Sequence, residues 1–455
     1  MHTAPHTPMS SKEMVDICLK HSLFSWSATG KVDPIPVARA EGIYLYSPEG
    51  KRWIDFNSQL MSVNIGHGHA RVIKAIQDQA ATLAYAYPGM ATEVRARLSL
   101  KLAKLVPGDL NTFFYTLGGA EANENAIKAA RLFTGRHKIL ARYRSYHGAT
   151  NGAISLTGDP RRWPTEPGMP GVVRVMDPKP YNFSFGTTDA EIVANNLKYL
   201  EEVIDYEGPK NIAAMFIETV TGTNGILPPP KGYLTGLKRL LEKHGILLVT
   251  DEVMCGFGRT GKLFAFQHSQ DDPGNPDGIV PDIVTMAKGI TSSYMPLGVM
   301  ALSDRIANHF RENVFWGGLT YNAHPMCLAA AEAAIDVLID EGMIENAAAM
   351  GKVMRRHMDA MQQKHRCVRE CRNAGLFGII ELRKNAKNDY LVPYGGSHPV
   401  MAKVGKHFRE NGLFTVLQWG GVMCNPPLCI NEQQIGEAFA IIDQGLAMVD
   451  EVFEG

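Results

Sequence analysis

The sequence predicts an α/β protein built around a mostly parallel β-sheet. Between about residues 59 and 325, short apolar runs alternate with segments of helical periodicity, a pattern typical of parallel sheets covered by helices. The chain of 455 residues is longer than one ordinary hydrophobic core requires, so we expect two or more lobes. Its hydrophobic fraction of 45% and charged fraction of 20% are normal for a soluble globular enzyme.

Five apolar runs are expected to form strands of this sheet, and the first of them leads directly into a helix. The runs cover residues 112–115, 138–141, 212–217, 245–250 and 282–287. The helix begins near Gly119 and continues to about Phe133, because acidic residues lie in its first turn, basic residues lie late and Gly135 can end it. Residues 59–325 are therefore expected to form a large domain. Within it, the Pro-, Gly- and Asp-rich stretches 158–190 and 270–282 are expected to be ordered or lid-like loops.

The two ends of the chain are expected to form a smaller domain together. Residues 42–46 and 51–56 flank a turn-like stretch and predict a β-hairpin. In the second half of the chain, an alanine-rich helix over 327–339 leads to another helix and then to a region that contains strands. The predicted small α+β domain therefore combines residues 1–58 with residues 326–455.

The charge balance and composition exclude several classes of partner. Lysine and arginine total 46, and aspartate and glutamate also total 46, so no net charge favours nucleic acid or an anionic membrane. No run approaches the 18 or more apolar residues of a membrane span. The N-terminus lacks a secretory signal pattern, and the seven scattered cysteines do not resemble a disulfide framework. We therefore expect a cytoplasmic protein without nucleic-acid or membrane partners.

An acid and a lysine stand at the ends of two predicted strands. Asp251 follows the run 245–250, and Lys288 follows the run 282–287. A lysine can form a Schiff base with the aldehyde of pyridoxal phosphate, and an aspartate can keep the pyridine nitrogen protonated, so that the ring accepts electrons. The pair therefore predicts a pyridoxal phosphate site in which Lys288 and Asp251 are the catalytic residues.

Two further features suit the same cofactor. Gly118 and Gly119 precede a helix and expose backbone N–H groups that can bind a phosphate. Tyr146, followed by His147, comes after a predicted strand, where an aromatic ring can stack on a flat cofactor. Taken alone, the glycine turn fits a ligand-free connection as well as it fits a phosphate site. Taken alone, Tyr146 fits an ordinary core position better than it fits a stacking position on a cofactor. Beside the lysine and the acid, the cofactor interpretation is favoured.

Three other patterns are not interpreted as sites. Residues 256–261 match the dinucleotide fingerprint Gly-x-Gly-x-x-Gly, but the acidic pair at the strand exit and the Pro- and Asp-rich stretch downstream argue against it. His67 and His69 lack acidic or cysteine partners at ligand spacing, so no metal site is expected. Cys367 and Cys371 lie on an expected helix without a second cysteine pair, so packing is their favoured role.

Four motifs stand out by their order and spacing along the chain. They are Gly-Ile-Leu-Leu-Val-Thr-Asp-Glu-Val (245–253), Gly-Phe-Gly-Arg-Thr-Gly (256–261), Ala-Lys-Gly (287–289) and Gly-Gly-Leu-Thr-Tyr-Asn-Ala-His-Pro (317–325). Together they resemble the motifs of class III pyridoxal-phosphate aminotransferases, and within that class the omega-aminotransferases of the omega-amino acid, taurine and amine:pyruvate types. The resemblance extends over nearly the whole chain. It implies the aspartate aminotransferase-like fold type I with a seven-stranded sheet, and a homodimer with shared active sites. Whether two dimers pair into a tetramer stays open.

The resemblance also implies a role for each matching residue. Lys288 would hold the cofactor and move a proton, and Asp251 would pair with the ring nitrogen. Gly119 and Ala120 would bind the phosphate through their N–H groups, whereas Thr320 would reach the phosphate of the neighbouring subunit. The residues near the ring would be Tyr146, His147, Glu218 and Val253, and the substrate pocket would include Trp26, Leu60, Met61, Tyr87 and Gln418.

One departure from the family bears on the substrate. Many relatives carry a mobile arginine before Pro-Pro-Leu that pairs with a substrate carboxylate, but residues 415–423 contain no arginine, and Gln418 lies at or near that position. An amide cannot supply the charged, bidentate fork of a guanidinium. Either another arginine binds the carboxylate, or the preferred donors are bulky or uncharged amines.

The expected reaction is a ping-pong transamination. An amine or an omega-amino acid would give its amino group to the cofactor, and a keto acid such as pyruvate would then accept it. An aminomutase, racemase or decarboxylase of the same fold would share the cofactor residues, so these alternatives stay open. A regulatory protein on the same scaffold is disfavoured, because the lysine, the acid and the phosphate turn are all present.

Overall fold

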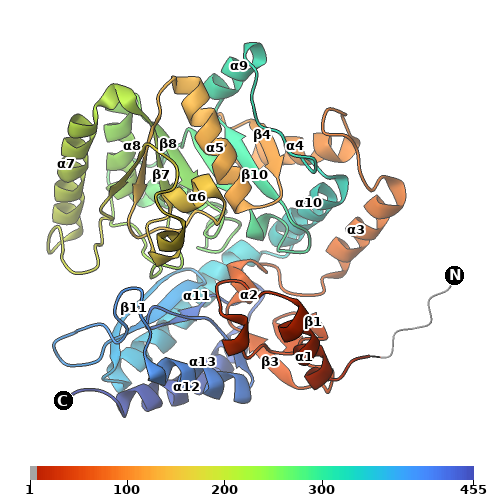
Figure 1. The fold of residues 1–455 in the computed structure, drawn as a ribbon, viewed down its shortest axis with the longest axis vertical. Helices are drawn as coiled ribbons and strands as arrows, with labels where there is room; N and C mark the ends of the chain where they lie inside the picture. Colours follow the sequence, from red (N-terminus) through yellow and green to blue (C-terminus); the bar gives the residue numbers. More distant parts are fainter. Residues whose placement is uncertain (1–7) are drawn as a thin grey trace.

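A computed structural model describes residues 8–455, and a seven-stranded sheet lies at its centre (Figure 1). The strands, in their order across the sheet, are β4 (Thr112–Thr116), β10 (Gly298–Leu302), β9 (Ile283–Met286), β8 (Leu247–Asp251), β7 (Ile212–Glu218), β5 (Lys138–Arg142) and β6 (Val172–Val175). Only β10 runs antiparallel to its neighbours, and the other pairs are parallel. The predicted α/β class and the mostly parallel seven-stranded sheet are therefore confirmed.

Helices cover the central sheet, which explains why its strands are almost continuously apolar. Every residue of β7 and β8 is buried, as expected for parallel strands that are covered on both faces. The helix α5 begins after Gly118 and ends at Gly135, which takes the left-handed conformation with φ 67°. The helices of this region are α3 (Ala70–Thr82), α4 (Glu93–Leu105), α5 (Gly119–Thr134), α6 (Asn151–Leu156), α7 (Asp189–Glu207), α8 (Tyr233–Lys243), α9 (Asp304–Glu312) and α10 (Pro325–Asp340).

Two smaller sheets are built from the ends of the chain. The first has the order β1 (Arg39–Glu41), β2 (Tyr44–Tyr46), β3 (Arg52–Asp55) and β13 (Leu413–Phe414), and the second β11 (Val368–Ala374), β12 (Phe377–Leu382), β15 (Gly421–Cys424) and β14 (Leu417–Gln418). Because β13 pairs with β3, segments more than 350 residues apart share one sheet. The helices here are α1 (Ser11–His21), α2 (Ser58–Met61), α11 (Met343–Lys364), α12 (Pro399–Glu410) and α13 (Glu432–Asp450). The predicted hairpin is confirmed as β2 and β3, whereas the domain boundaries near 58 and 325 remain a prediction.

Two expectations about local structure were wrong. Cys371 lies in strand β11 and Cys367 directly precedes it, so neither is helical. The antiparallel pairing of β11 with β12 overrides the helical tendency of this stretch. The stretch 158–190 is also more than a loop, because it contains the short edge strand β6. None of the helices formed by residues 8–455 is long and apolar enough to span a membrane.

Arg259, in the turn that follows β8, joins three parts of the chain. Its side chain is fully buried. Nη1 donates to the carbonyl oxygens of Leu376 (3.1 Å) and Pro426 (2.5 Å), and Nη2 donates to Ser58 Oγ and Asn64 Oδ1, both at 2.9 Å. Burial lowers the pKa of this guanidinium to about 9. The Gly-x-Gly-x-x-Gly stretch therefore contributes a structural arginine.

Replacing Arg259 with methionine is expected to lower the free energy of unfolding by about 2–4 kcal/mol. The substitution keeps the volume but leaves four buried oxygen atoms without their donor, and each unsatisfied group costs about 1–3 kcal/mol, offset in part by removal of a buried charge. Urea unfolding followed by circular dichroism measures the change. Arg239→Met, at an exposed position on α8, is the matched control. Equal stability of the two variants would contradict the assigned role.

Candidate active site

A cavity of about 740 Å³ opens at the carboxyl ends of the parallel strands, where α/β sheets generally bind ligands. Twelve of the fourteen residues singled out from the sequence line this cavity. They are Trp26, Leu60, Met61, Gly119, Ala120, Tyr146, His147, Glu218, Asp251, Val253, Lys288 and Gln418. Thr320 and Tyr87 are not among the lining residues, and the Tyr87 side chain is 67% exposed. The sequence-based site is thus largely assembled within one chain.

Asp251 ends β8 and is held by three donors. Its Oδ2 lies 2.9 Å from His147 Nδ1 and accepts a hydrogen bond from Asn123 Nδ2 at 2.8 Å. Its Oδ1 accepts the backbone N–H of Val253 at 3.0 Å. Because both oxygen atoms are tethered, the carboxylate has one orientation toward the cavity.

Asn123, on α5, is a positioning residue that the sequence did not reveal. Its amide nitrogen also donates to the carbonyl oxygen of His147 (2.7 Å), and its amide oxygen accepts a hydrogen bond from Thr285 (2.7 Å). Since the carbonyl oxygen of His147 can only accept a hydrogen bond, the amide nitrogen must point toward it and toward Asp251. No local motif predicts this role, because Asn123 and its partners Thr285, His147 and Asp251 lie in different parts of the chain.

Glu218 ends β7 and faces the same cavity as a buried carboxyl group. Its two oxygen atoms accept the backbone N–H groups of Tyr146 and Gly222, both at 2.9 Å. Burial raises the pKa of Glu218, and the nearby His147 and the two N–H groups act in the opposite direction. The hydrogen bond to Tyr146 fixes the backbone that presents the aromatic ring to the cavity.

Lys288 follows β9 with the positive φ of 49°, a conformation that is uncommon for residues other than glycine. Its side chain reaches the cavity from the carboxyl end of β9, at the same edge of the sheet as Glu218. Burial lowers the pKa of the amine, whereas the negative charges of Asp251 and Glu218 partly raise it. A lysine with a lowered pKa is a better nucleophile and base near neutral pH.

We expect the reactivity of Lys288 to rise with pH at values below those of an ordinary lysine, which has a pKa of about 10.4. Only the neutral amine is nucleophilic, and a lowered pKa shifts the rise of the neutral fraction to lower pH. The rate at which pyridoxal phosphate becomes covalently attached to the cofactor-free protein, followed by absorbance, measures this dependence. A midpoint at or above the ordinary value would contradict the effect of burial.

The start of α5 offers a cradle for an anion. Its N-cap residue, Gly118, provides no side-chain cap, so the N–H groups of the first turn face the cavity without a side-chain acceptor. A Cβ atom on Gly119 would lie 2.7 Å from Val253 Cγ1, so only glycine allows this close approach. An uncapped helix start beside a lysine and an acid fits the phosphate of pyridoxal phosphate.

Arg161, in the stretch 158–190, is a cavity residue that the sequence analysis missed. Its guanidinium is anchored by the buried carboxylate of Asp159 and by Thr223 Oγ1, which accepts from Nη2 at 2.6 Å. Its Cζ lies 3.7 Å from the centre of the Tyr146 ring. Among the described residues, Nη1 has no hydrogen-bond partner. The cavity therefore contains a preorganised guanidinium although residues 415–423 contain no arginine.

Comparisons with known proteins agree with this geometry. A family model described as aminotransferase class-III matches residues 27–446. The chain is 30% identical to the taurine–pyruvate aminotransferase of Bilophila wadsworthia, over 92% of this chain and 94% of that protein. A taurine:2-oxoglutarate aminotransferase from Bifidobacterium kashiwanohense, solved in complex with PLP and glutamate, superimposes with a TM-score of 0.93 at 36% identity, over 99% of this chain and 100% of that one.

A second solved structure is similar to almost the same extent. An (S)-enantioselective omega-transaminase from Thermomicrobium roseum superimposes with a TM-score of 0.91 at 35% identity, over 98% of this chain and all of the other. Class III aminotransferases use pyridoxal phosphate, and the uncapped helix start, the tethered acid and the lysine provide the groups that this cofactor requires. From its sequence, its fold and its assembled site, the chain belongs to the class III aminotransferases.

Proposed function

We propose that the protein is an omega-transaminase that moves an amino group from an amine or omega-amino acid to a keto acid such as pyruvate, by a ping-pong reaction. The observation that carries this proposal is the convergence of Lys288, Asp251 and Arg161 on one cavity. When bound, pyridoxal phosphate supplies the electron sink, and the protein supplies orientation and proton transfer. The Lys288 amine would hold the cofactor and would move the proton of the substrate carbon.

The other residues hold the cofactor and the substrate in place. Asp251, oriented by His147 and Asn123, pairs with the ring nitrogen. The N–H groups of Gly119 and Ala120 bind the phosphate, as is usual at an uncapped helix start.

The presence of Arg161 in the cavity favours a natural amino donor or amino acceptor that carries an anionic group. Its Nη1, which has no hydrogen-bond partner among residues 8–455, can bind one oxygen atom of a carboxylate or sulfonate. Charge-assisted hydrogen bonds of this type are stronger than neutral ones. Asp159 neutralises part of the positive charge of Arg161. It also holds the guanidinium in one position, which lowers the entropy cost of binding an anionic substrate. Without an arginine near Gln418, either another arginine binds the substrate acid or the preferred donors are bulky or uncharged amines. The position of Arg161 favours the first of these alternatives.

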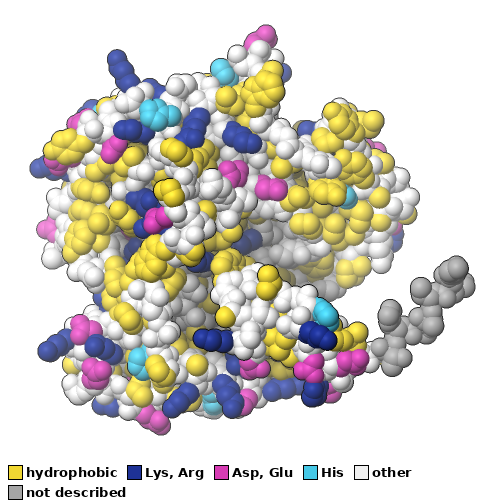
Figure 2. All heavy atoms as spheres, in the orientation of Figure 1, with side chains coloured by type: hydrophobic (Ala, Val, Ile, Leu, Met, Phe, Trp, Pro, Cys, Tyr) yellow, Lys and Arg dark blue, Asp and Glu magenta, His cyan; other side chains and the backbone are white. Residues whose placement is uncertain are grey.

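A homodimer with shared active sites is part of this proposal. The segments around Tyr85 and Thr320 lie side by side, because the Tyr85 hydroxyl group donates to the Thr320 carbonyl oxygen at 2.8 Å. Both segments carry exposed apolar side chains. Figure 2 shows hydrophobic side chains gathered on the face over α3 and α4. The exposed hydrophobic residues of these segments are Leu83, Tyr85, Tyr87, Met90, Val314, Trp316 and Tyr321. Large exposed apolar surfaces of this kind mark protein interfaces.

The reaction is tested by product analysis with the cofactor-loaded protein. Taurine, β-alanine, 4-aminobutyrate and 1-phenylethylamine are each incubated with pyruvate, and alanine formation is measured. Alanine from taurine or β-alanine supports binding of the anion by Arg161, and alanine only from 1-phenylethylamine would favour the uncharged donors. An isomerised amine without alanine would overturn the transaminase proposal in favour of a mutase or racemase.

A further inference from the structure

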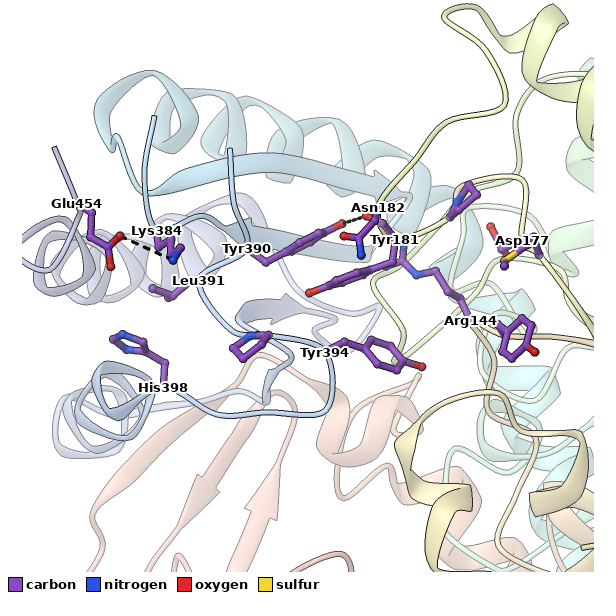
Figure 3. Close-up of a pocket in the computed structure, with 14 residues that line it drawn as sticks. Arg144, Asp177, Tyr181, Asn182, Lys384, Tyr390, Leu391, Tyr394, His398 and Glu454 are labelled. Carbon is purple, nitrogen blue, oxygen red and sulfur yellow. Dashed lines mark hydrogen bonds and ion pairs between the residues drawn. The ribbon is translucent and has the colours of Figure 1, made fainter. Parts of the chain in front are cut away.

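A second cavity, of about 770 Å³, lies between the segment 176–182 and the segment 384–398 (Figure 3). It shares no lining residue with the catalytic cavity. Its exposed wall surface is mainly apolar, and charged or polar side chains lie among the apolar ones, a composition found in small-molecule sites. Its apolar walls are formed chiefly by Met176, Pro180, Tyr181, Tyr390, Leu391 and Tyr394.

The three tyrosine rings line the cavity and are held in place by one another and by neighbouring arginines. Arg369 Cζ lies 3.8 Å from the centre of the Tyr390 ring, and Arg144 Cζ lies 5.9 Å from that of Tyr181. Tyr181 and Tyr390 are stacked, with ring centres 4.0 Å apart and an angle of 8°, and Tyr394 meets Tyr181 edge-on at 5.4 Å. Their hydroxyl groups donate to backbone carbonyl oxygens: that of Tyr181 to Val392 at 3.3 Å and that of Tyr390 to Tyr181 at 3.2 Å. An aromatic ligand can therefore pack against a rigid surface.

Arg144 supplies the charge that remains uncompensated in these walls. Its guanidinium donates to the carbonyl oxygens of Lys179 (3.1 Å) and Asn224 (2.6 Å), and no carboxylate of the described residues forms an ion pair with it. The carboxylates in the walls are already paired, Asp177 with Arg142 at 3.2 Å and Glu454 with Lys384 at 3.8 Å. The two carbonyl oxygens use only two of the five N–H donors, so others remain for a ligand.

We propose that this cavity binds a small aromatic anion, with its ring against the three tyrosines and its carboxylate or other acidic group on Arg144. Charge complementarity identifies an anion, because Arg144 is the cation without a carboxylate partner. The stacked tyrosines identify a ring, because aromatic surfaces gain most from offset or edge-on contact with another ring.

The cavity lies close enough to the catalytic site for a ligand to influence it. Arg144 and Tyr394 also line a small pocket together with Gln418 and Trp419. The Trp419 ring is stacked near Tyr394, with ring centres 6.2 Å apart and an angle of 18°. Gln418 in turn lines the catalytic cavity. Trp419 is therefore a natural fluorescent reporter of binding in the second cavity.

The test titrates 1-naphthoate into the cofactor-loaded protein by calorimetry, with tryptophan fluorescence as a second readout. We expect a Kd of about 1 mM or lower. Arg144→Gln and Tyr394→Ala should each weaken binding at least about tenfold, the effect of a lost charge-assisted hydrogen bond or ring contact. The neutral amide of the probe should also bind at least about tenfold more weakly. Tyr206→Ala, which alters an exposed tyrosine on α7, should have no effect.

Arg161→Gln separates the two cavities, because Arg161 lines only the catalytic one. Binding that survives this substitution but is lost in Arg144→Gln supports the proposal. Binding that is lost in Arg161→Gln and kept in both other variants would place the probe in the catalytic cavity and overturn it. Absence of binding to the unaltered protein up to about 10 mM would also overturn it. Circular dichroism checks folding, and Tyr394→Ala gives an independent result if Arg144→Gln unfolds.

Discussion

Replacing Lys288 with alanine is expected to reduce amino transfer by at least about 10³- to 10⁴-fold, the largest effect of any single substitution in this protein. The variant lacks the amine proposed to hold the cofactor and to move the substrate proton, and Lys288 is the one lysine of residues 8–455 that lines the cavity. Steady-state alanine formation measures the rate, and mass spectrometry after borohydride reduction measures the covalently attached cofactor.

The matched control for this substitution is Lys352→Ala, at an exposed position on α11. It should keep both the rate and the attached cofactor. The Lys288→Ala protein should still bind the cofactor without a covalent bond, because the tethered Asp251 and the helix start are unchanged. A residual rate within tenfold of the unaltered protein, or cofactor attached to another lysine, would contradict the assignment.

Replacing Arg161 with glutamine is expected to lower kcat/KM for taurine and β-alanine by about 10- to 150-fold, which corresponds to about 1.5–3 kcal/mol for hydrogen bonds to a charged group. For 1-phenylethylamine, which has no anionic group, the change should be much smaller. The separate effects on donors with and without an acid distinguish substrate binding from a general loss of activity.

Arg162→Gln is the matched control, since Arg162 pairs with Glu166 and does not line the cavity. It should leave the ratio between anionic and neutral donors unchanged. An equal fall for all donors in Arg161→Gln would indicate that Arg161 supports the Tyr146 ring without binding the substrate. A smaller loss for the acids than for the aryl amine would rule out its role as the anion-binding residue.

The central sheet and the core of the site could be predicted from the sequence, because both depend on local patterns. Apolar runs marked strands β4, β5, β7, β8 and β9, and their chain order allowed only a mostly parallel arrangement. Parallel strands end at the same edge of a sheet, so residues that directly follow them must lie near one another. This reasoning placed Asp251 and Lys288 together, and the structure brings both to one cavity.

Residues whose roles depend on distant contacts could not be predicted in this way. Asn123 bonds to Thr285 across 162 positions, and Arg259 bonds to Pro426 across 167. The strand that contains Cys371 forms because β12 pairs with it, although its own sequence suited a helix.

The sequence by itself determined the α/β class, the use of pyridoxal phosphate and the absence of arginine from residues 415–423, since each follows from residue order. Only the tertiary structure decided that Arg161 lies in the cavity, because Asp159 and Thr223 must first fold around it. Likewise, the aromatic cavity exists only where two distant segments meet and Tyr181 stacks on Tyr390. Such sites depend on packing between elements, which no local pattern of residues encodes.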